Sequence, residues 1–406
     1  MVIMIVPTFI FVLFITTSTP LFCDSLRHSL SAPKICRVNN FILRRKSPKN
    51  TPVFLQPTSN YLNCNSLVLD RHERPNPKEL LALLNVLPNT HIVSLHVIGV
   101  PINIDIAVRL SAYIENSRLQ TIHLLDLDTL DNGMIAILSK AMKDSKELKT
   151  IIFANMFQSL SGDASTSLTS MMMSTKANHV DFRGFNGGNK FISSIIAGFR
   201  NPNIKSIGLR QINLNITGLK EIANVIPYSK VEHLDLSGNK LQDIGMKIIS
   251  RYILKSSTIV ELDLSDNLIS DIGIIDLAMG LEDNEHIHHL NLLNNIDITD
   301  DGVIELNEML TDEMYGNNII VSIELTIGHF DKGPSIQRLN DMNKLLKRNK
   351  VRKRDHRTER PIPKKKIWPH EGSVSGTNTL IGIDGPKEFE RLAPSPLKRL
   401  LASGEL

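Results

Sequence analysis

Histidine and acidic side chains recur at regular intervals through the middle of the chain, beside short apolar segments. Imidazole and carboxylate groups are suitable ligands for a transition metal, and a row of carboxylates also attracts a basic protein surface. The residue types therefore fit two kinds of site, a metal centre or an acidic surface for a basic partner. The side chains concerned are His179, Asp181, His233, Asp235, Glu261, Asp263, His289 and Asn291.

The acidic surface is the better supported, because no motif that carries catalysis or holds a cofactor accompanies these residues. The sequence has no nucleotide-cradling loop, no zinc-ligand spacing and no hydrolase elbow. Polar side chains are also ordinary on the solvent-facing side of a sheet. We therefore predict a protein that is not an enzyme, with no cofactor, no metal and no small-molecule substrate.

Short strands are expected to position these side chains. Alternating leucines make a strand with one buried side, and an asparagine three residues later can hydrogen-bond the backbone of a tight turn. In three consecutive copies the first leucines are 28 residues apart. The copies comprise Leu234, Leu236 and Asn239, then Leu262, Leu264 and Asn267, then Leu290, Leu292 and Asn295.

A helix is expected after each turn. An aspartate precedes an apolar run in every copy, at Asp243, Asp271 and Asp301, and we interpret it as a helix N-cap. Neither the strand nor the helix can bury its apolar side alone, so the copies must stack. The apolar residues at helical spacing in the first copy are Ile244, Ile248, Ile249, Tyr252 and Ile253.

Copies of this kind and length resemble leucine-rich repeats of the ribonuclease-inhibitor-like class. The resemblance implies an α/β fold, a leucine-rich-repeat solenoid shaped as a curved horseshoe, with a parallel inner sheet, helices outside and about ten strand-helix repeats. We assign this domain to residues 59–346. Alternation along each strand places the histidine and acidic side chains on the concave face.

Weaker copies precede the clear ones at similar intervals. The copy near Ile151 is irregular, because serines, threonines and methionines fill Ser159 to Met173, and a loop or an irregular repeat is expected there. At the other end Ile323 anchors a last strand, and Asp331 to Leu346 are expected to form a helix that closes the array. The earlier anchors are Leu67, Leu95, Ile122, Ile151, Val180 and Ile207.

The N-terminal residues have the composition of a targeting sequence. Residues 1–23 are almost wholly apolar as far as Thr16, which is typical of a secretory signal peptide, and residues 24–58 are basic and rich in Ser, Asn and Pro. The second segment is interpreted as a disordered linker; the pair also resembles the two-part leaders that direct proteins to the plastid of apicomplexan-type cells. We expect the secretory pathway, with the cytoplasm as the alternative if the apolar start is an artefact.

A basic run follows the array, inside residues 347–406, which we interpret as a largely disordered tail. Basic side chains concentrate in residues 24–50 and 344–366, so the repeats between them carry net negative charge. The run is interpreted as a solvated tail or an electrostatic contact, and the predicted signal peptide disfavours nucleic-acid binding. Its members are Lys347, Arg348, Lys350, Arg352, Lys353 and Arg354.

The last repeats carry a narrower resemblance. Residues Gly328 to Pro334, Asn349 to Arg354 and Asn267 to Glu285 are similar in order to the end of the tropomodulin repeat domain. This resemblance implies capping of the pointed ends of actin filaments, with actin or tropomyosin as partner. The N-terminal actin- and tropomyosin-binding helices of that family are not recognisable here, and its members carry no secretory leader.

The sequence thus predicts a non-enzymatic scaffold that binds a partner protein through its concave face and adjoining loops. The partner is expected to be a basic protein or the basic tail of the chain itself. Two alternatives remain: a tropomodulin-like actin cap, and an activator of the small GTPase Ran, whose repeat family tends toward an acidic tail where this chain has a basic one.

Overall fold

The computed structural model divides into two compact units. Unit 1 holds Met1–Phe182 and Asn203–Ile207, and unit 2 holds Arg183–Pro202 and Gly208–Leu406. The residues that the structure describes are 35–37, 42–43, 53–54, 65–71, 76–156, 160, 162–185, 188–256, 258–282, 284–311, 317, 319–326 and 334–355.

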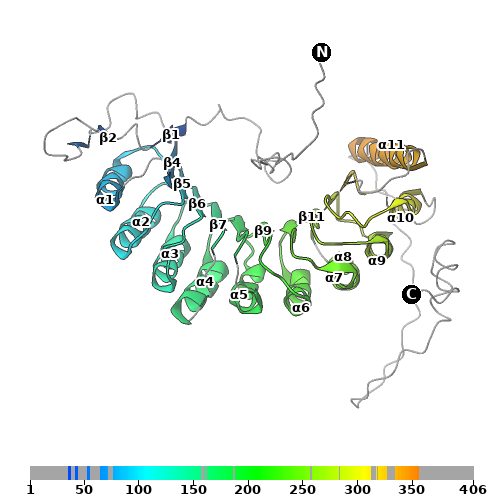
Figure 1. Ribbon diagram of the computed structural model, residues 1–406, viewed down its shortest axis with the longest axis horizontal. Coiled ribbons are helices and arrows are strands. Elements are labelled where there is room, and N and C mark those ends of the chain that lie inside the picture. The colour runs from blue at the N-terminus through cyan, green and yellow to red at the C-terminus, as the bar shows by residue number, and fades with distance from the viewer. Residues whose placement is uncertain are drawn as a thin grey trace, which may run out of the picture. The chain divides into compact units, whose positions relative to one another are not determined.

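Unit 1 alternates parallel strands with helices. Strand β1 pairs with β4, and β4 to β8 pair in chain order, while β2 and β3 form a separate antiparallel pair. Figure 1 shows α1 to α4 together on one side of β4 to β7. The elements are β1 (Ile35–Arg37), β2 (Ile42–Leu43), β3 (Val53–Phe54), β4 (Ser66–Asp70), α1 (Pro77–Val86), β5 (Ser94–Ile98), α2 (Ile104–Asn116), β6 (Thr121–Leu125), α3 (Asn132–Asp144), β7 (Thr150–Ala154), α4 (Gly162–Ser174), β8 (His179–Asp181) and the start of β9 (Ser206–Gly208).

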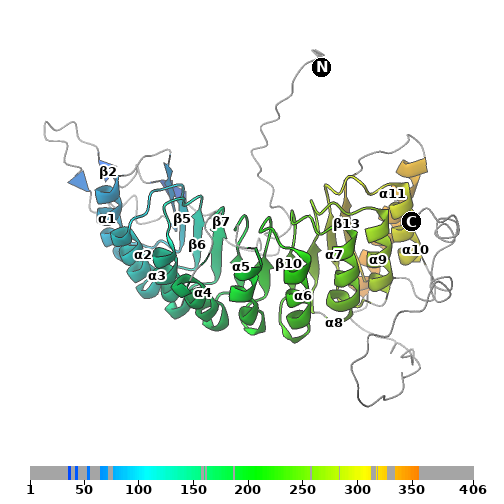
Figure 2. The ribbon, with the colours of Figure 1, turned by 60° about the horizontal axis from the view of Figure 1, so that its bottom comes forward.

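Unit 2 follows the same plan. Strands β10 to β13 pair in parallel and in chain order, and Figure 2 shows α6, α7, α9 and α10 on one side of them. The elements are α5 (Gly188–Ile195), α6 (Ile216–Val225), β10 (His233–Asp235), α7 (Gln242–Ile248), the π-helical turn η7 (Ile249–Ile253), α8 (Leu254–Ser256), β11 (Glu261–Asp263), α9 (Asp271–Glu282), β12 (His289–Leu292), α10 (Asp300–Thr311), β13 (Ser322–Leu325) and α11 (Pro334–Asp355).

The predicted strand anchors form the core between sheet and helices. Leu234, Leu262, Leu290 and Ile323 share one register position across β10 to β13, and all four side chains are buried. The anchors of the earlier strands are buried in the same way. The α/β leucine-rich-repeat solenoid is therefore confirmed, with ten repeat strands, β4 to β13, in the described part of the chain.

A ladder of buried asparagines ties the turns of unit 2 together. The side-chain oxygen of Asn267 accepts hydrogen bonds from the backbone N–H groups of Asn239 and Leu241, at 3.2 and 3.3 Å, in the preceding repeat. Its amide group donates to one carbonyl in each of the two repeats, at 3.0 and 3.1 Å. Asn295 receives the N–H of Asn267 in turn, at 2.9 Å. The predicted turn role of these asparagines is confirmed, and the same side chains also join successive repeats.

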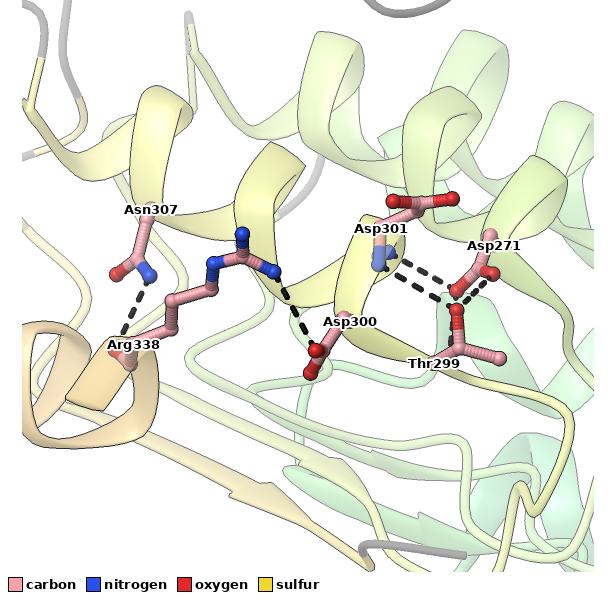
Figure 3. A network of polar contacts seen from close by, with 7 residues as sticks. Asp271, Thr299, Asp300, Asp301, Asn307 and Arg338 are labelled. Atoms are coloured by element: carbon pink, nitrogen blue, oxygen red, sulfur yellow. Dashed lines mark hydrogen bonds and ion pairs between the residues drawn. The ribbon is translucent and has the colours of Figure 1, made fainter. Parts of the chain in front are cut away.

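The aspartates interpreted as N-caps have a different role. Asp243 and Asp271 lie within the first turns of α7 and α9, and their carboxylates accept hydrogen bonds from the following repeat. Asp271 accepts from the N–H and the hydroxyl of Thr299, at 2.8 and 2.7 Å (Figure 3). Asp243 accepts from Ser270 in the same way, at 2.9 and 2.7 Å. The N-cap interpretation is wrong, because each helix has already begun at its aspartate.

Replacing Asp271 with alanine should lower the free energy of unfolding by about 1–3 kcal/mol, because the part-buried N–H groups of Thr299 and Gly302 both lose their acceptor. Asp301 is the matched control, since it is exposed and lies within the same network (Figure 3). Urea unfolding should place Asp301→Ala within about 0.5 kcal/mol of the wild type. Equal losses in the two variants would contradict the cross-repeat role.

Helix α11 closes the array in place of a further repeat. Asp300 occupies the position equivalent to Asp271, and its carboxylate pairs with Arg338 of α11 at 3.4 Å (Figure 3). Farther along α11, Arg348 donates to the carbonyl of Leu310 at 2.9 Å, at the end of α10. The helix therefore continues to Asp355 rather than ending at Leu346, and the basic run from Lys347 to Arg354 is helical rather than a disordered tail.

Two other expectations for local structure are wrong. Of the two alternatives for the irregular copy, the loop is wrong, since Gly162–Ser174 form helix α4. Burial of Leu168, Met171 and Met172 outweighs the weak helix preference of the serines and threonines. Residues 24–58 were predicted to be a disordered linker, but Ile35–Arg37 within them form strand β1, which pairs with β4. This pairing gives partners to hydrogen-bonding groups on an edge of β4 that would otherwise have none.

Both terminal predictions concern residues outside the described part. The signal peptide (1–23) and the tail beyond Asp355 stay predictions, as do the domain boundaries. Among the described residues, no helix has the length and apolar character that crossing a membrane requires.

Candidate functional site

The helix-free face of unit 2 is the side of β10 to β13 opposite their helices, and two polar rows cross it. Alternation along the strands turns these side chains away from the leucine core. The predicted neighbours are confirmed: Glu261 lies between His233 and His289, and Asp235 lies beside Asp263. The first row is His233, Glu261, His289 and Ser322, and the second row is Asp235, Asp263, Asn291 and Glu324.

The first row is built around Glu261. Its Oε2 lies 2.8 Å from Nδ1 of His233, and both side chains are about one-fifth exposed, at 18% and 23%. Burial alone would raise the pKa of Glu261, but the hydrogen bond from His233 and the charges of His233, His289 and His288 outweigh burial and lower it. Glu261 is therefore a stable carboxylate at neutral pH.

The second row ends its strands with a repeated turn. Asp235 Oδ1 accepts hydrogen bonds from the N–H and hydroxyl of Ser237, at 2.9 and 2.6 Å. Asp263 does the same with Ser265, at 2.9 and 2.7 Å. One carboxylate oxygen of each aspartate thus fixes the turn, while the carboxylate charge stays at the strand end.

Asn291 replaces the aspartate in the third strand and keeps its structural role. Its side-chain oxygen accepts from the N–H of Leu293 at 3.0 Å, and its amide donates to Asp263 Oδ2 at 2.9 Å. On the next strand, burial and the charge of Asp263 raise the pKa of Glu324. Oδ1 of Asp235 and Oδ1 of Asp263 therefore each hold a turn, and Oδ2 of Asp263 also accepts from Asn291.

The substitution Asp263→Asn should lower the pKa of Glu324 toward its ordinary value, because one of the two causes that raise it is a negative charge. Asparagine keeps the acceptor for Ser265, as Asn291 shows one strand away. Carboxyl-carbon NMR titration measures the change. An unaltered Glu324 pKa would contradict the electrostatic coupling along the row.

The two predicted residues in unit 1 contribute less than expected. Asp181 is only 4% exposed, so its side chain offers little surface to a partner. His179 is half-buried, and its Nδ1 lies 2.7 Å from the hydroxyl of Ser206. Their burial could not be read from strand alternation, which assigns a face but not the surface left open on it.

A pair of histidines on unit 1 was missed. His96 and His123 occupy one register position on β5 and β6, with ring centroids 4.2 Å apart and nearly perpendicular planes. Burial lowers the pKa of His96, and its Nε2 lies 2.9 Å from the hydroxyl of Ser94. The alternation rule would have placed both on the helix-free side, since each follows a buried anchor.

The basic residues are carried on α11. Lys347 and Lys350 are exposed, whereas Arg348 is half-buried against the end of α10. The side chains of Arg352, Lys353 and Arg354 lie outside the described residues. Within the described ranges, no three His, Cys, Asp or Glu side chains are grouped as metal ligands would be.

Comparison with known proteins gives one family model and two solved structures. Residues 229–250 and 255–278 match a family model described as Leucine Rich repeat. Among solved structures, the chain is similar to Leiomodin-1 Actin-Binding Site 2, with 21% identity over 34% of this chain and 76% of that one at a TM-score of 0.30. It is also similar to a structure of the yeast Rad7 and Elc1 complex, with 16% identity over 70% of this chain and 68% of that one at a TM-score of 0.48. No curated protein gives a significant match.

The matched segments contain Asn239 and Asn267 of the ladder and the strands β10 and β11. The chain therefore carries leucine-rich repeats, and the candidate site lies on the strands of those repeats.

Proposed function

We propose that the protein is a non-enzymatic scaffold that binds a basic partner protein through the helix-free face of unit 2 and the loops beside it. The observation that carries the proposal is the second row, where Asp235, Asp263 and Glu324 place carboxylates on three of four adjacent strands. Adjacent strands lie about 4.8 Å apart, so the carboxylates form a compact acidic strip.

Two features support binding over a purely structural role. Like charges on neighbouring strands destabilise a sheet unless something offsets them, and Asn291 shows that the turn needs no charge. Two aspartates on adjacent strands therefore repel each other and lower the stability of the free protein. A basic partner would remove this repulsion by charge complementarity.

Affinity capture with the full chain tests the proposal. The charge-reversed variant Asp235→Lys with Asp263→Lys should lose the partners that the wild type retains, and raised salt should weaken their capture. The control is Glu115→Lys with Glu147→Lys, which makes the same change in net charge at exposed positions on unit 1. Thermal unfolding of each variant verifies its fold. Identical partners in the wild type and both variants would refute the proposal.

Actin capping is the second candidate, and the order of residues shared with tropomodulins favours it. Many of those residues are buried repeat determinants, including Asn267, Leu277, Leu281 and Asn284, so the likeness in Asn267 to Glu285 is explained by the fold. Gly328 to Gly333 lie outside the described residues. Slowed pointed-end elongation of actin by the full chain would support this function, and unaltered elongation would count against it.

We also propose that the apolar start directs the chain into the secretory pathway, from its composition alone. A C-terminally tagged full chain should lose residues 1–23 and be found in that pathway. An uncleaved cytosolic chain would refute this location and favour the actin candidate.

A further inference from the structure

Large aliphatic side chains lie exposed on the turns after β11 and β12 and at the starts of α7 and α9. We call Ile244, Leu268, Ile272 and Ile296 the aliphatic edge. They are 62%, 43%, 47% and 53% exposed. Leu268 and Ile296 each follow a ladder asparagine, and Ile244 and Ile272 each follow a cross-repeat aspartate. The edge is therefore two pairs of equivalent positions in successive repeats.

Hydrogen bonds between the repeats hold these positions together. Ser270 and Asp297 form a parallel bridge, which places the segment after Leu268 beside the segment after Ile296. The bonds from Ser270 to Asp243, at 2.9 and 2.7 Å, place the start of α7 beside the start of α9. The four side chains thus lie on one edge of unit 2. Isolated exposed apolar residues are ordinary, whereas a grouped set marks an interaction surface.

The backbone conformation at Leu268 is unfavourable for leucine. Its φ is 57°, in the left-handed region that non-glycine residues other than asparagine and aspartate rarely adopt. The side chain of Leu268 is 43% exposed, so a large part of its apolar surface is open to a partner.

The charges around the aliphatic edge identify the partner's chemistry. Asp297 and Asp301 are exposed beside it, and Asp263 of the acidic strip is separated from Leu268 only by the turn that contains Asn267. At the far end, a hollow of about 260 Å³ is lined by Leu214, Leu241, Ile244 and Lys240, among others. Asp263, Asp297 and Asp301 carry negative charge near Leu268 and Ile296, so basic side chains on the partner are complementary there.

We infer that the aliphatic edge and the acidic strip together bind a partner segment in which aliphatic side chains are flanked by Lys or Arg. The inference rests on the proposed function, which supplies the acidic strip, and adds an apolar contact that charge alone does not require. The aliphatic side chains dock on Leu268, Ile272 and Ile296. The basic side chains pair with the neighbouring carboxylates.

Two fluorescent peptides test the inference with the full chain. One combines leucine and lysine in the pattern of an amphipathic helix, and the other has glutamine in place of every leucine. The wild type should bind the leucine peptide at least about tenfold more tightly, since burial of one leucine supplies that much. The variant Leu268→Asn with Ile272→Gln should lose this preference and keep its fold, because asparagine suits a positive φ.

The matched control is Met279→Gln, which removes an apolar side chain that is 41% exposed elsewhere on α9; it should keep the preference. Equal binding of the two peptides by the wild type would overturn the apolar contact while leaving the acidic strip intact. Binding of neither peptide would overturn both. Self-association of the wild type that Leu268→Asn abolishes would assign the edge to a second copy instead.

Discussion

Replacing Asn267 with alanine should lower the free energy of unfolding by at least about 2 kcal/mol. The substitution leaves the N–H groups of Asn239 and Leu241 without an acceptor, whereas the carbonyls of Leu236 and Ser265 lose one of two donors and keep the other. All four hydrogen bonds are buried, and each unsatisfied buried group costs about 1–3 kcal/mol. Because the ladder connects repeats, the loss also weakens the coupling on which a stacked array depends.

Urea unfolding followed by helical circular dichroism measures this loss. Asn343→Ala is the control, since Asn343 is exposed on α11 and its replacement should change stability by no more than about 0.5 kcal/mol. A loss of less than about 1 kcal/mol for Asn267→Ala would contradict the account of the ladder.

Adding one methyl group at Gly273 should destabilise the protein by about 2–3 kcal/mol. A Cβ there would lie 2.4 Å from Asp243 Oδ1 and 2.7 Å from Ile269 Cγ2, far inside van der Waals contact. Moving Asp243 away would break both of its bonds to Ser270. The glycine is therefore required by close packing between repeats.

Gly133 supplies the contrast, because it stands at the corresponding place in a repeat of unit 1. A Cβ there meets only Asp131 Oδ1, at 3.3 Å. Since alanine is favoured over glycine in a helix by up to about 1 kcal/mol, Gly133→Ala should leave stability unchanged or raise it. Thermal unfolding measures the change in stability of Gly273→Ala and of Gly133→Ala. Equal changes in the two variants would contradict the close approach at Gly273.

The strands and their register were predictable because one pattern fixes both. Leucines that repeat every 28 residues give the strand, its buried side and its neighbours, so the adjacency of Asp235 and Asp263 was predicted and is confirmed. The role of Asp243 was not predictable in this way. A carboxylate before an apolar run suits an N-cap or a bond to the next repeat equally well, and only the position of Ser270 decides.

Exposure on the helices was also beyond the sequence pattern. Ile244, Ile249 and Ile253 were read as one apolar face, yet Ile249 and Ile253 are fully buried and Ile244 is 62% exposed. The helix changes to a π-helical turn at Ile249, which alters the periodicity that the prediction assumed.

Affinity for a fluorescent oligolysine peptide, measured by anisotropy at low salt, tests the central claim most directly. The variant Asp235→Asn with Asp263→Asn removes two charges from the acidic strip while keeping the turn acceptors, as Asn291 does in the native chain. Removing two nearby charges should weaken binding about tenfold, whereas Glu115→Gln with Glu147→Gln should leave it nearly unchanged. Equal affinity in the wild type and both variants would contradict the assignment of the helix-free face as the site for a basic partner.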